Sequence, residues 1–304
     1  MQASKELFLD YRPLLFSTAY NMLGSVEDAE DMVQETYLKW IEMPETPITH
    51  VKAYLVRVLV NKCINYLETA RVQREEYIGT WLPEAIPDTA FADEHHIAES
   101  YHALSIGMLI VLEKLTPQER AIFILREVFA YDYNELSEIL GKSEDSCRQI
   151  FKRAKDQLGK KGKRFKVDTK AHEAILNNFI EASFGGNINE LIALFKEDIA
   201  LYADGGGKTF TLNGVKLSAV RKPIHGSEGV ATFLTNIASK IFKAAPDVRI
   251  ERVSVNGEPS FVSYFGGMPL SVITFETDGE KISKIFIQSN PDKLTLFSEQ
   301  LQRN

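Results

Sequence analysis

Residues 116–158 read TPQERAIFILREVFAYDYNELSEILGKSEDSCRQIFKRAKDQL, and this stretch predicts a run of helices that ends in a tight turn and a basic helix. Thr116 can cap the first helix, because Glu119 stands where a capping box needs an acid. Gly141 suits the turn after the next, shorter helix, and Ser143 can cap the helix that follows it.

The helix predicted from Ser143 to Leu158 has two different faces. Arg148, Lys152 and Lys155 form a basic stripe. Residues 141–170 hold 11 Lys or Arg against 4 Asp or Glu, in a chain whose net charge is −7. The other face repeats apolar residues at helical spacing, and these residues are Cys147, Ile150, Phe151, Ala154 and Leu158.

A short helix, a glycine turn and a basic helix predict a helix-turn-helix, whose second helix enters the major groove of DNA. A surface helix with a solvated charged face fits the same pattern. On the DNA-binding interpretation, the first residues face base edges and the later ones lie near bases or phosphates. The candidate residues are Ser143, Glu144, Asp145, Ser146, Arg148, Gln149, Lys152 and Arg153.

Length and composition predict a globular chain of two or three domains, since it has 304 residues, 44% of them hydrophobic and 25% charged. Cys63 and Cys147 lie on apolar helix faces, so we expect them to fill cores in a reducing compartment. The sequence shows no signal segment and no apolar run as long as a membrane span. We therefore expect a cytoplasmic protein, or a nuclear one in a eukaryote, that has no membrane partner.

Four residues could suggest a metal site, but no further ligand stands at a coherent spacing from them. They are Glu94, His95, His96 and Glu99. We expect neither a metal nor another cofactor.

The first 75 residues predict three helices. The helix from Val26 to Glu42 carries five acids within nine residues, which fits a solvated face or a docking surface for a basic partner. The helix from His50 to about Ala70 is apolar almost all round at first and is the expected core helix. Its end carries amides, an aromatic ring and nearby arginines, which fit a surface for single-stranded bases or a helix leaving its core.

Three motifs in this order resemble bacterial RNA polymerase sigma factors of the small extracytoplasmic-function class, which keeps only regions 2 and 4. They are DAEDMVQETYLKW at 28–40, the run from Ala53-Tyr54-Leu55-Val56-Arg57 to Leu67, and LTPQERA at 115–121 before the helix-turn-helix. The resemblance covers about residues 5–163. It implies a non-enzymatic protein whose partners are core RNA polymerase and promoter DNA.

The resemblance also implies a role for each helix. The acidic helix would dock on core polymerase through Asp28, Asp31, Gln34, Glu35, Leu38 and Trp40. The −10 element would be recognised and melted by Arg57, Asn61, Asn65, Tyr66, Arg71 and Arg74. The helix from Ser143 would read the −35 element.

The expected architecture is two all-α sigma modules followed by an α+β domain. Region 2 is expected as a helical bundle over 1–75 and region 4 as a helix-turn-helix over 105–165, with 76–104 as the linker between them. The linker is too apolar for a free tether, and Trp81 and Leu82 are expected to dock on another domain.

Residues 168–304 begin with helices and become rich in predicted strands, which indicates an α+β domain with a curved antiparallel sheet. This part resembles the SnoaL-like cone fold. With the Trp81 linker motif, in which Ala85 replaces the usual proline, two short motifs resemble the sigma subgroup with a fused SnoaL-like extension. They are Asp204-Gly205-Gly206-Gly207-Lys208 and Asn290-Pro291-Asp292-Lys293-Leu294.

In that subgroup the extension is implied to regulate the sigma core in cis, whether by inhibition or by assistance. The expected regulatory contacts are Trp81, Leu82, Asp204, Gly205, Gly206, Gly207, Lys208, Asn290, Pro291, Asp292 and Lys293. A P-loop is excluded at Gly207-Lys208-Thr209, because Tyr202 stands where the pattern requires glycine.

Two other functions fit parts of the sequence. A SnoaL-like cyclase or isomerase needs a general base in its cavity, and the candidates are Asp204, His225 and Tyr264. They form no convincing acid/base pair, so a cavity that binds a small molecule without catalysis is the milder alternative. A helix-turn-helix repressor would instead bind DNA without polymerase.

Overall fold

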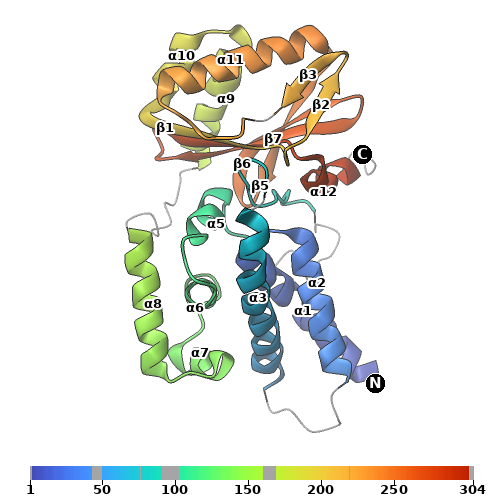
Figure 1. Cartoon of the computed structure of the whole chain (residues 1–304), viewed down its shortest axis with the longest axis vertical. Coiled ribbons are helices and arrows are strands. Elements are labelled where there is room, and N and C mark those ends of the chain that lie inside the picture. Colours follow the sequence, from blue (N-terminus) through green and yellow to red (C-terminus); the bar gives the residue numbers. More distant parts are fainter. Residues whose placement is uncertain are drawn as a thin grey trace. The chain divides into compact units, whose positions relative to one another are not determined.

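The computed structural model describes residues 2–42, 50–75, 77–90, 103–159, 169–218 and 220–300. These residues fall into two compact units (Figure 1). The helical unit is Met1–Glu75, Phe91–Leu104 and Met108–Lys163, and the C-terminal unit is Glu76–Ala90, Ser105–Gly107 and Arg164–Asn304. The segment Glu76–Ala90 therefore folds with a domain that begins about 75 residues later in the sequence.

Three helices form the first bundle of the helical unit: α1 (Gln2–Leu23), α2 (Val26–Ile41) and α3 (Val51–Glu75). Ser25 caps α2 as predicted, since its side chain accepts a hydrogen bond from the backbone of Asp28. The first half of α3 supplies the buried centre of the bundle: Leu55 and Leu59 are fully buried, as are Phe16 and Tyr20 of α1, which packs on α3. The predicted core helix is therefore confirmed, although it continues past Ala70.

In the described part of 103–159, four further helices follow: α5 (Ile106–Leu112), α6 (Pro117–Glu127), α7 (Tyr133–Leu140) and α8 (Glu144–Leu158). Thr116 and Glu119 form the predicted capping box. Gly141 ends α7 in the left-handed region at φ 62°, and Ser143 caps α8 by accepting from the backbone of Ser146. The predicted apolar stripe of α8 is buried throughout, namely Cys147, Ile150, Phe151, Ala154 and Leu158.

The two helical modules pack on each other within this unit, because α6 and α7 both contact α3. The buried guanidinium of Arg120 donates to the backbone oxygen of Met22 at 2.8 Å and to the Glu113 carboxylate at 2.9 Å. The Lys52 ammonium lies 4.7 Å from the centre of the Tyr131 ring. Because charge-assisted hydrogen bonds depend on geometry, the buried Arg120 guanidinium favours this one packing of the two modules, which we call the closed helical unit.

The C-terminal unit places helices over one face of a six-stranded sheet whose order is β4-β1-β8-β7-β6-β5, with β2 and β3 as a separate hairpin. Its helices are α9 (Thr169–Gly185), α10 (Ile188–Leu194), α11 (Ser227–Ala244), the 3-10 helix η2 (Pro291–Lys293) and α12 (Thr295–Gln300). Its strands are β1 (Phe195–Asp204), β2 (Thr209–Leu212), β3 (Val215–Ser218), β4 (Ile224–His225), β5 (Arg249–Val255), β6 (Glu258–Phe265), β7 (Met268–Thr277) and β8 (Ile282–Gln288).

The prediction of an antiparallel sheet is wrong at one pair of strands, since β1 and β8 run parallel. Parallel neighbours need a long connection, and here α11 and six strands separate the two in sequence. The pairing sets Asp204 opposite Gln288, so the carboxyl ends of both strands lie together. The α+β class itself is confirmed, and so are the Asn213-Gly214 and Asn256-Gly257 turns, where all four residues have positive φ.

Both cysteines are free and buried, as expected for core residues. Burial also raises the pKa of the Cys63 thiol. Among the described residues, none of the helices is long and apolar enough to cross a bilayer, and no group of His, Cys, Asp and Glu could hold a metal ion. The residues Glu94 to Glu99, which first suggested a metal, lie outside the described residues.

The pH dependence of the C-terminal unit should depend on Glu258. Burial, with the nearby Glu276 carboxylate, raises the pKa of Glu258 from 4.5 to about 7. An acid whose pKa is higher in the folded state adds stability below its unfolded pKa, and this stability is lost as pH rises through the folded pKa. We expect the unit to be more stable at about pH 5 than at about pH 8, and Glu258→Gln to remove most of the difference.

Denaturant unfolding at both pH values, followed by Trp81 emission in a Trp40→Phe chain, measures this. The pKa of Asp278 is lowered to about 2 by its hydrogen bond from Lys196, so its stabilisation is already complete across this window. Asp278→Asn is therefore the matched control and should leave the slope between the two pH values unchanged. An equal slope in the parent and in Glu258→Gln would contradict the assignment.

Candidate functional site

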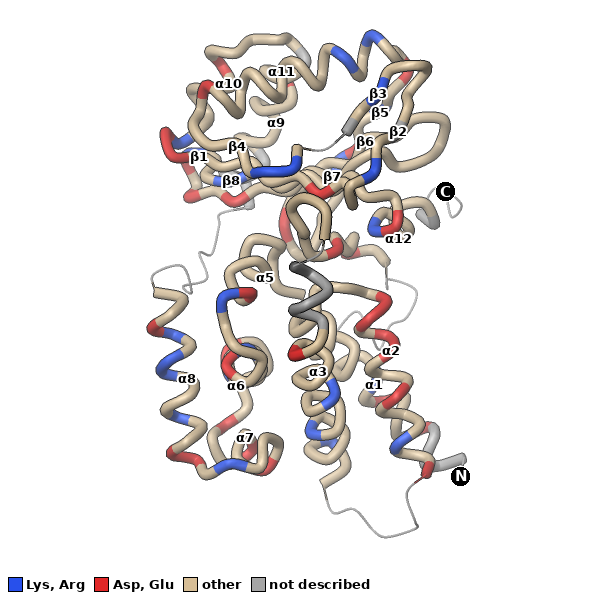
Figure 2. Tube along the Cα trace, viewed as in Figure 1, with Lys and Arg blue, Asp and Glu red and all other residues tan. Residues whose placement is uncertain are grey.

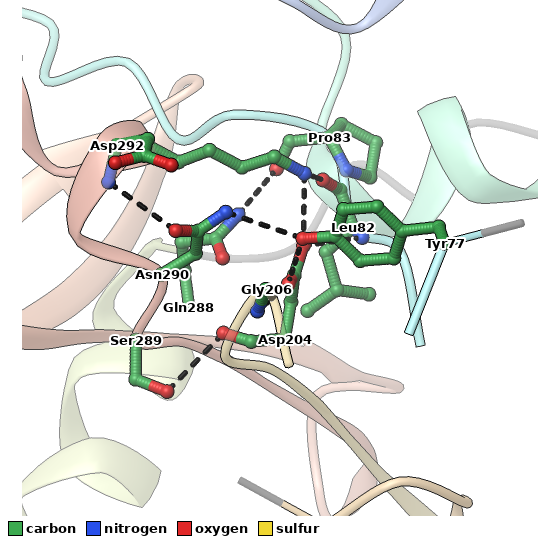
Figure 3. Close-up of polar contacts among 10 residues, drawn as sticks. Tyr77, Leu82, Pro83, Asp204, Gly206, Gln288, Ser289, Asn290 and Asp292 are labelled. Carbon is green, nitrogen blue, oxygen red and sulfur yellow. Dashed lines mark hydrogen bonds and ion pairs between the residues drawn. The ribbon is translucent and has the colours of Figure 1, made fainter. Parts of the chain in front are cut away.

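A buried carboxylate at the end of β1 holds the segment Glu76–Ala90 on the C-terminal unit (Figure 3). Asp204 has no exposed surface. One of its oxygens accepts from the Tyr77 hydroxyl at 2.6 Å and from the backbone of Gly206 at 2.9 Å. The other accepts from the backbone of Leu82 at 2.9 Å and from the Lys293 ammonium at 2.8 Å. Four donors from three separate stretches of sequence thus converge on one side chain.

Lys293 ties the second short motif to the same point. Its ammonium also donates to the backbone oxygen of Leu82 at 2.6 Å and lies 4.5 Å from the centre of the Trp81 ring. Burial and the hydrogen bond to Asp204 raise the pKa of Tyr77, which keeps its hydroxyl protonated as a donor. The Tyr77 hydroxyl in turn accepts from the Asn290 amide at 3.2 Å. The name linker clamp is used below for this cluster, which consists of Asp204, Lys293, Tyr77, Asn290 and Leu82.

Glycine is required in the loop after Asp204 by conformation and by space. Gly206 has φ +61°, and a β-carbon there would lie 2.7 Å from the side chain of Asn290. Gly207 has φ +69°, and a β-carbon there would lie 2.8 Å from Ile78. A larger residue would push away the second motif or the linker segment. Gly205, before them, is buried.

Lys208 and Asp292 extend the contact at the surface. Their side chains form an ion pair and remain 51% and 68% exposed. Such an exposed pair adds little stability compared with the buried carboxylate. Pro291 begins the 3-10 helix that carries Lys293 to the clamp.

Three residues absent from the sequence-based site hold the rest of the linker segment. The Asn256 side chain accepts from the backbone of Ile86 at 2.9 Å, and its own backbone donates back to Ile86 at 3.0 Å. Asp88 bonds the Ser254 hydroxyl and the backbone of Gly257. Gln288 donates to the backbone oxygen of Pro83 at 3.2 Å. Leu82 and Ile86 are consequently buried, with 1% and 0% exposed.

The sequence patterns around these residues are weak or indicate a different role. Asn256-Gly257 reads as a hairpin turn, which it is, and the sequence gives no second reason for the amide. Gln288 lies in a strand whose alternation was recognised, but its partner is about 200 residues away. Tyr77 marks the start of the linker without any motif of its own.

The predicted −35 residues lie on the exposed face of α8, along which Figure 2 shows a row of Lys and Arg. Arg148, Gln149, Lys152 and Arg153 are exposed, as is Asp145. Glu144 pairs with Arg148 at 2.7 Å, and the Arg148 guanidinium lies 4.4 Å from the centre of the Tyr133 ring on α7. Ser143 caps α8, and Ser146 supplies the backbone donor.

The side chains predicted to contact the −10 element differ in how exposed they are. Arg57, Asn61 and Asn65 are exposed and recur every fourth residue, so they form one stripe along α3. Tyr66 is half-buried, and its hydroxyl donates to Asp28 at 2.6 Å. Arg71 and Arg74 lie in the last turns of α3, where the helix is described but side chains are not.

The predicted polymerase-docking residues form an acidic and apolar face on α2, whose Asp and Glu positions are marked in Figure 2. Asp31, Gln34 and Leu38 are exposed at spacings of three and four, and 53% of Leu38 is accessible. Glu35 pairs with Lys62 at 2.6 Å. Trp40 is half-buried against Tyr54 and Asp28 is bound by Tyr66, so these two support the face from within.

The candidate catalytic residues do not meet in a cavity. Asp204 is occupied by the linker clamp, His225 is exposed on β4, and Tyr264 is buried, which raises its pKa. None of the three lines the large cavity of the C-terminal unit among the described residues.

Comparison with known proteins agrees with this arrangement. Residues 7–72 match the family model described as Sigma-70 region 2, and residues 111–158 match Sigma-70, region 4. The chain is 30% identical over 297 residues to the ECF RNA polymerase sigma factor SigJ of Mycobacterium tuberculosis (strain ATCC 25618 / H37Rv), covering 93% of this chain and 91% of that protein. The chain belongs to the ECF RNA polymerase sigma factors. The resemblance predicted from the three motifs is confirmed, and it extends through the C-terminal unit.

Two further comparisons also span the whole chain. The crystal structure of the M. tuberculosis SigJ protein superposes with a TM-score of 0.71 at 26% identity, over 96% of this chain and 98% of that one. A probable ECF sigma factor SigI of the same species, strain CDC 1551 / Oshkosh, is 24% identical over 286 residues, covering 93% of this chain and 92% of that protein. As a sigma factor, the protein binds core RNA polymerase and promoter DNA to initiate transcription.

Asp204→Asn should release the linker segment. The substitution removes a buried negative charge and sets an amide against four donors, so Lys293 loses the carboxylate that balances its charge. Breaking one partner of a buried pair costs about 3–5 kcal/mol. We expect Trp81 emission in a Trp40→Phe chain to shift toward that of exposed tryptophan, and limited proteolysis to cut within 77–90.

Asp292→Asn is the matched control, because it breaks the exposed pair with Lys208. We expect a change within about 1 kcal/mol and a protected linker segment. Equal protease resistance in both variants would show that Asp204 does not hold the segment.

Proposed function

We propose that the SnoaL-like domain regulates the sigma core in cis by holding part of the chain that joins regions 2 and 4. The linker clamp supports this proposal, because the fully buried carboxylate of Asp204 binds that segment through the backbone of Leu82. A connector that only joins two modules needs no such contact. The compartment follows from the function: bacterial polymerase works in the cytoplasm.

The reason for restraint lies in the closed helical unit. The guanidinium of Arg57, a proposed −10 residue, lies within 4 Å of the position a β-carbon would take at Gly141, in the turn before α8. The −10 and −35 elements are about 25 base pairs apart, or roughly 85 Å along B-DNA. The two modules must therefore separate to bind both. Holding residues 77–90 shortens the free chain that can span the gap, so docking restrains initiation.

The exposed faces are proposed to take the roles implied for them. The exposed residues of α8 contact the −35 element, and the stripe of Arg57, Asn61 and Asn65 on α3 contacts the −10 strand, with Arg71 and Arg74 beyond it. The face of α2 around Leu38 docks on core polymerase, since an acidic surface with exposed apolar side chains suits a partner that is basic at its rim and apolar at its centre.

Run-off transcription with core polymerase tests the regulation. We expect the Asp204→Asn chain to raise the amount of transcript about three-fold or more at an unchanged start site, because the linker is freed while the DNA faces stay intact. Asp292→Asn should match the parent chain. An unchanged or lower yield from Asp204→Asn would refute restraint by docking.

A second prediction concerns the DNA face. Lys152 is exposed on α8 and has no charged partner among the described residues. Lys152→Glu should weaken promoter binding by the polymerase complex about ten-fold and reduce the salt slope of binding by about one. Gel shifts at several salt concentrations measure both. Lys240→Glu, on the exposed face of α11, makes the same charge change away from DNA and should have no effect.

A further inference from the structure

The C-terminal unit contains an apolar cavity of about 150 Å³ between the inner face of the sheet and helices α9 and α11. Protein interiors are normally packed with few voids larger than a water molecule, so an opening of this size is a built feature or a cost. Phe179, Phe233, Ile237, Phe261 and Ile273 are among its lining side chains. Apolar cavities of about this volume stay dry and take up benzene.

The polar groups around the cavity restrict what it can hold. None of the described residues that line it carries a charge, so an ionic molecule would find no counter-charge. Ser263 and Ser271 already bond each other at 2.8 Å, and Ser289 bonds the backbone oxygen of Asp204. The hydroxyl of Ser183 on α9 is buried and has no hydrogen-bond partner among the described residues. A guest with one hydroxyl or carbonyl group could satisfy it.

A single layer of β-sheet separates the cavity from the linker clamp. Side chains alternate across a strand. On β8, Ile287 lines the cavity, whereas the next residue, Gln288, bonds the linker at Pro83. On β1, Ala203 lines the cavity, whereas Asp204 holds Leu82. A guest that moves these strands therefore moves the groups that grip the linker.

We propose that this cavity binds a neutral, ring-sized apolar molecule with at most one hydroxyl or carbonyl group, and that its occupancy is transmitted through β1 and β8 to the linker clamp. The second part rests on the proposed regulatory role of that clamp. The absence of lining charge sets the class of guest, the volume sets its size, and Ser183 sets its single polar contact.

Thermal unfolding of the full chain tests binding, with benzene, phenol and benzoate as probes. Trp40 and Trp81 are the two tryptophans of the sequence, so a Trp40→Phe chain reports the C-terminal unit through Trp81. We expect benzene to raise the midpoint by about 2–5 °C, phenol to raise it further, and benzoate to leave it unchanged. Ser183→Ala should reduce the effect of phenol to that of benzene.

Filling the cavity provides the second comparison. Ala238→Phe, on the cavity side of α11, should abolish the benzene shift, whereas Ser239→Phe, on the exposed side of the same helix, should retain it. If Ala238→Phe does not fold, the Ser183→Ala comparison still decides the question. No shift with benzene, or an equal shift with benzoate, would overturn the site.

Transmission is read in the folded state. Benzene should move the emission maximum of Trp81 in the Trp40→Phe chain, and Ala238→Phe should prevent the movement. Binding without any change in Trp81 would overturn the coupling. Because no polymerase is present, either failure is distinguishable from failure of cis regulation, which the transcription yield of Asp204→Asn tests alone.

Discussion

The C-terminal half of this sigma factor depends on how one buried carboxylate is satisfied. A carboxylate removed from water is costly unless charges and hydrogen bonds replace its hydration. Asp204 obtains a cation from Lys293, a hydroxyl from Tyr77 and backbone donors from Leu82 and Gly206. Two of these donors belong to the linker, so undocking would expose or orphan a buried charge. Docking of this segment is therefore close to all-or-none.

The helical unit follows a different physical rule. Its charged faces lie at the surface, while packing and one buried guanidinium hold the modules together. Arg120 donates to the carbonyl at Met22, near the end of α1, where a helix leaves acceptors unsatisfied. Opening this unit would return that guanidinium to water, which compensates part of the lost bonds.

Much of the helical part could be predicted from sequence because its signals are local. The capping box at Thr116, the turn at Gly141 and the buried stripe of α8 need information from at most fifteen residues. The clamp could not be assembled in that way. Its motifs were recognised, but their meeting depends on the parallel pairing of β1 with β8, a contact between distant strands that periodicity does not encode. Asn256 was missed because a turn already explained it, and β4 because two residues carry no period.

Under the proposed regulation, the linker clamp holds residues 77–90, whereas opening on the promoter needs them free. The free energy of docking therefore matters when it is comparable with the free energy of opening. A switch from mostly closed to mostly open requires a preference of about 5.5 kcal/mol for the open state, whereas a change of 1.4 kcal/mol shifts the ratio ten-fold. A clamp worth a few kcal/mol thus cannot abolish initiation by a tightly bound polymerase, but it can set its rate. Under the proposed cis regulation, the C-terminal unit would reduce the rate of initiation without abolishing it, to an extent set by the geometry at the carboxyl ends of β1 and β8.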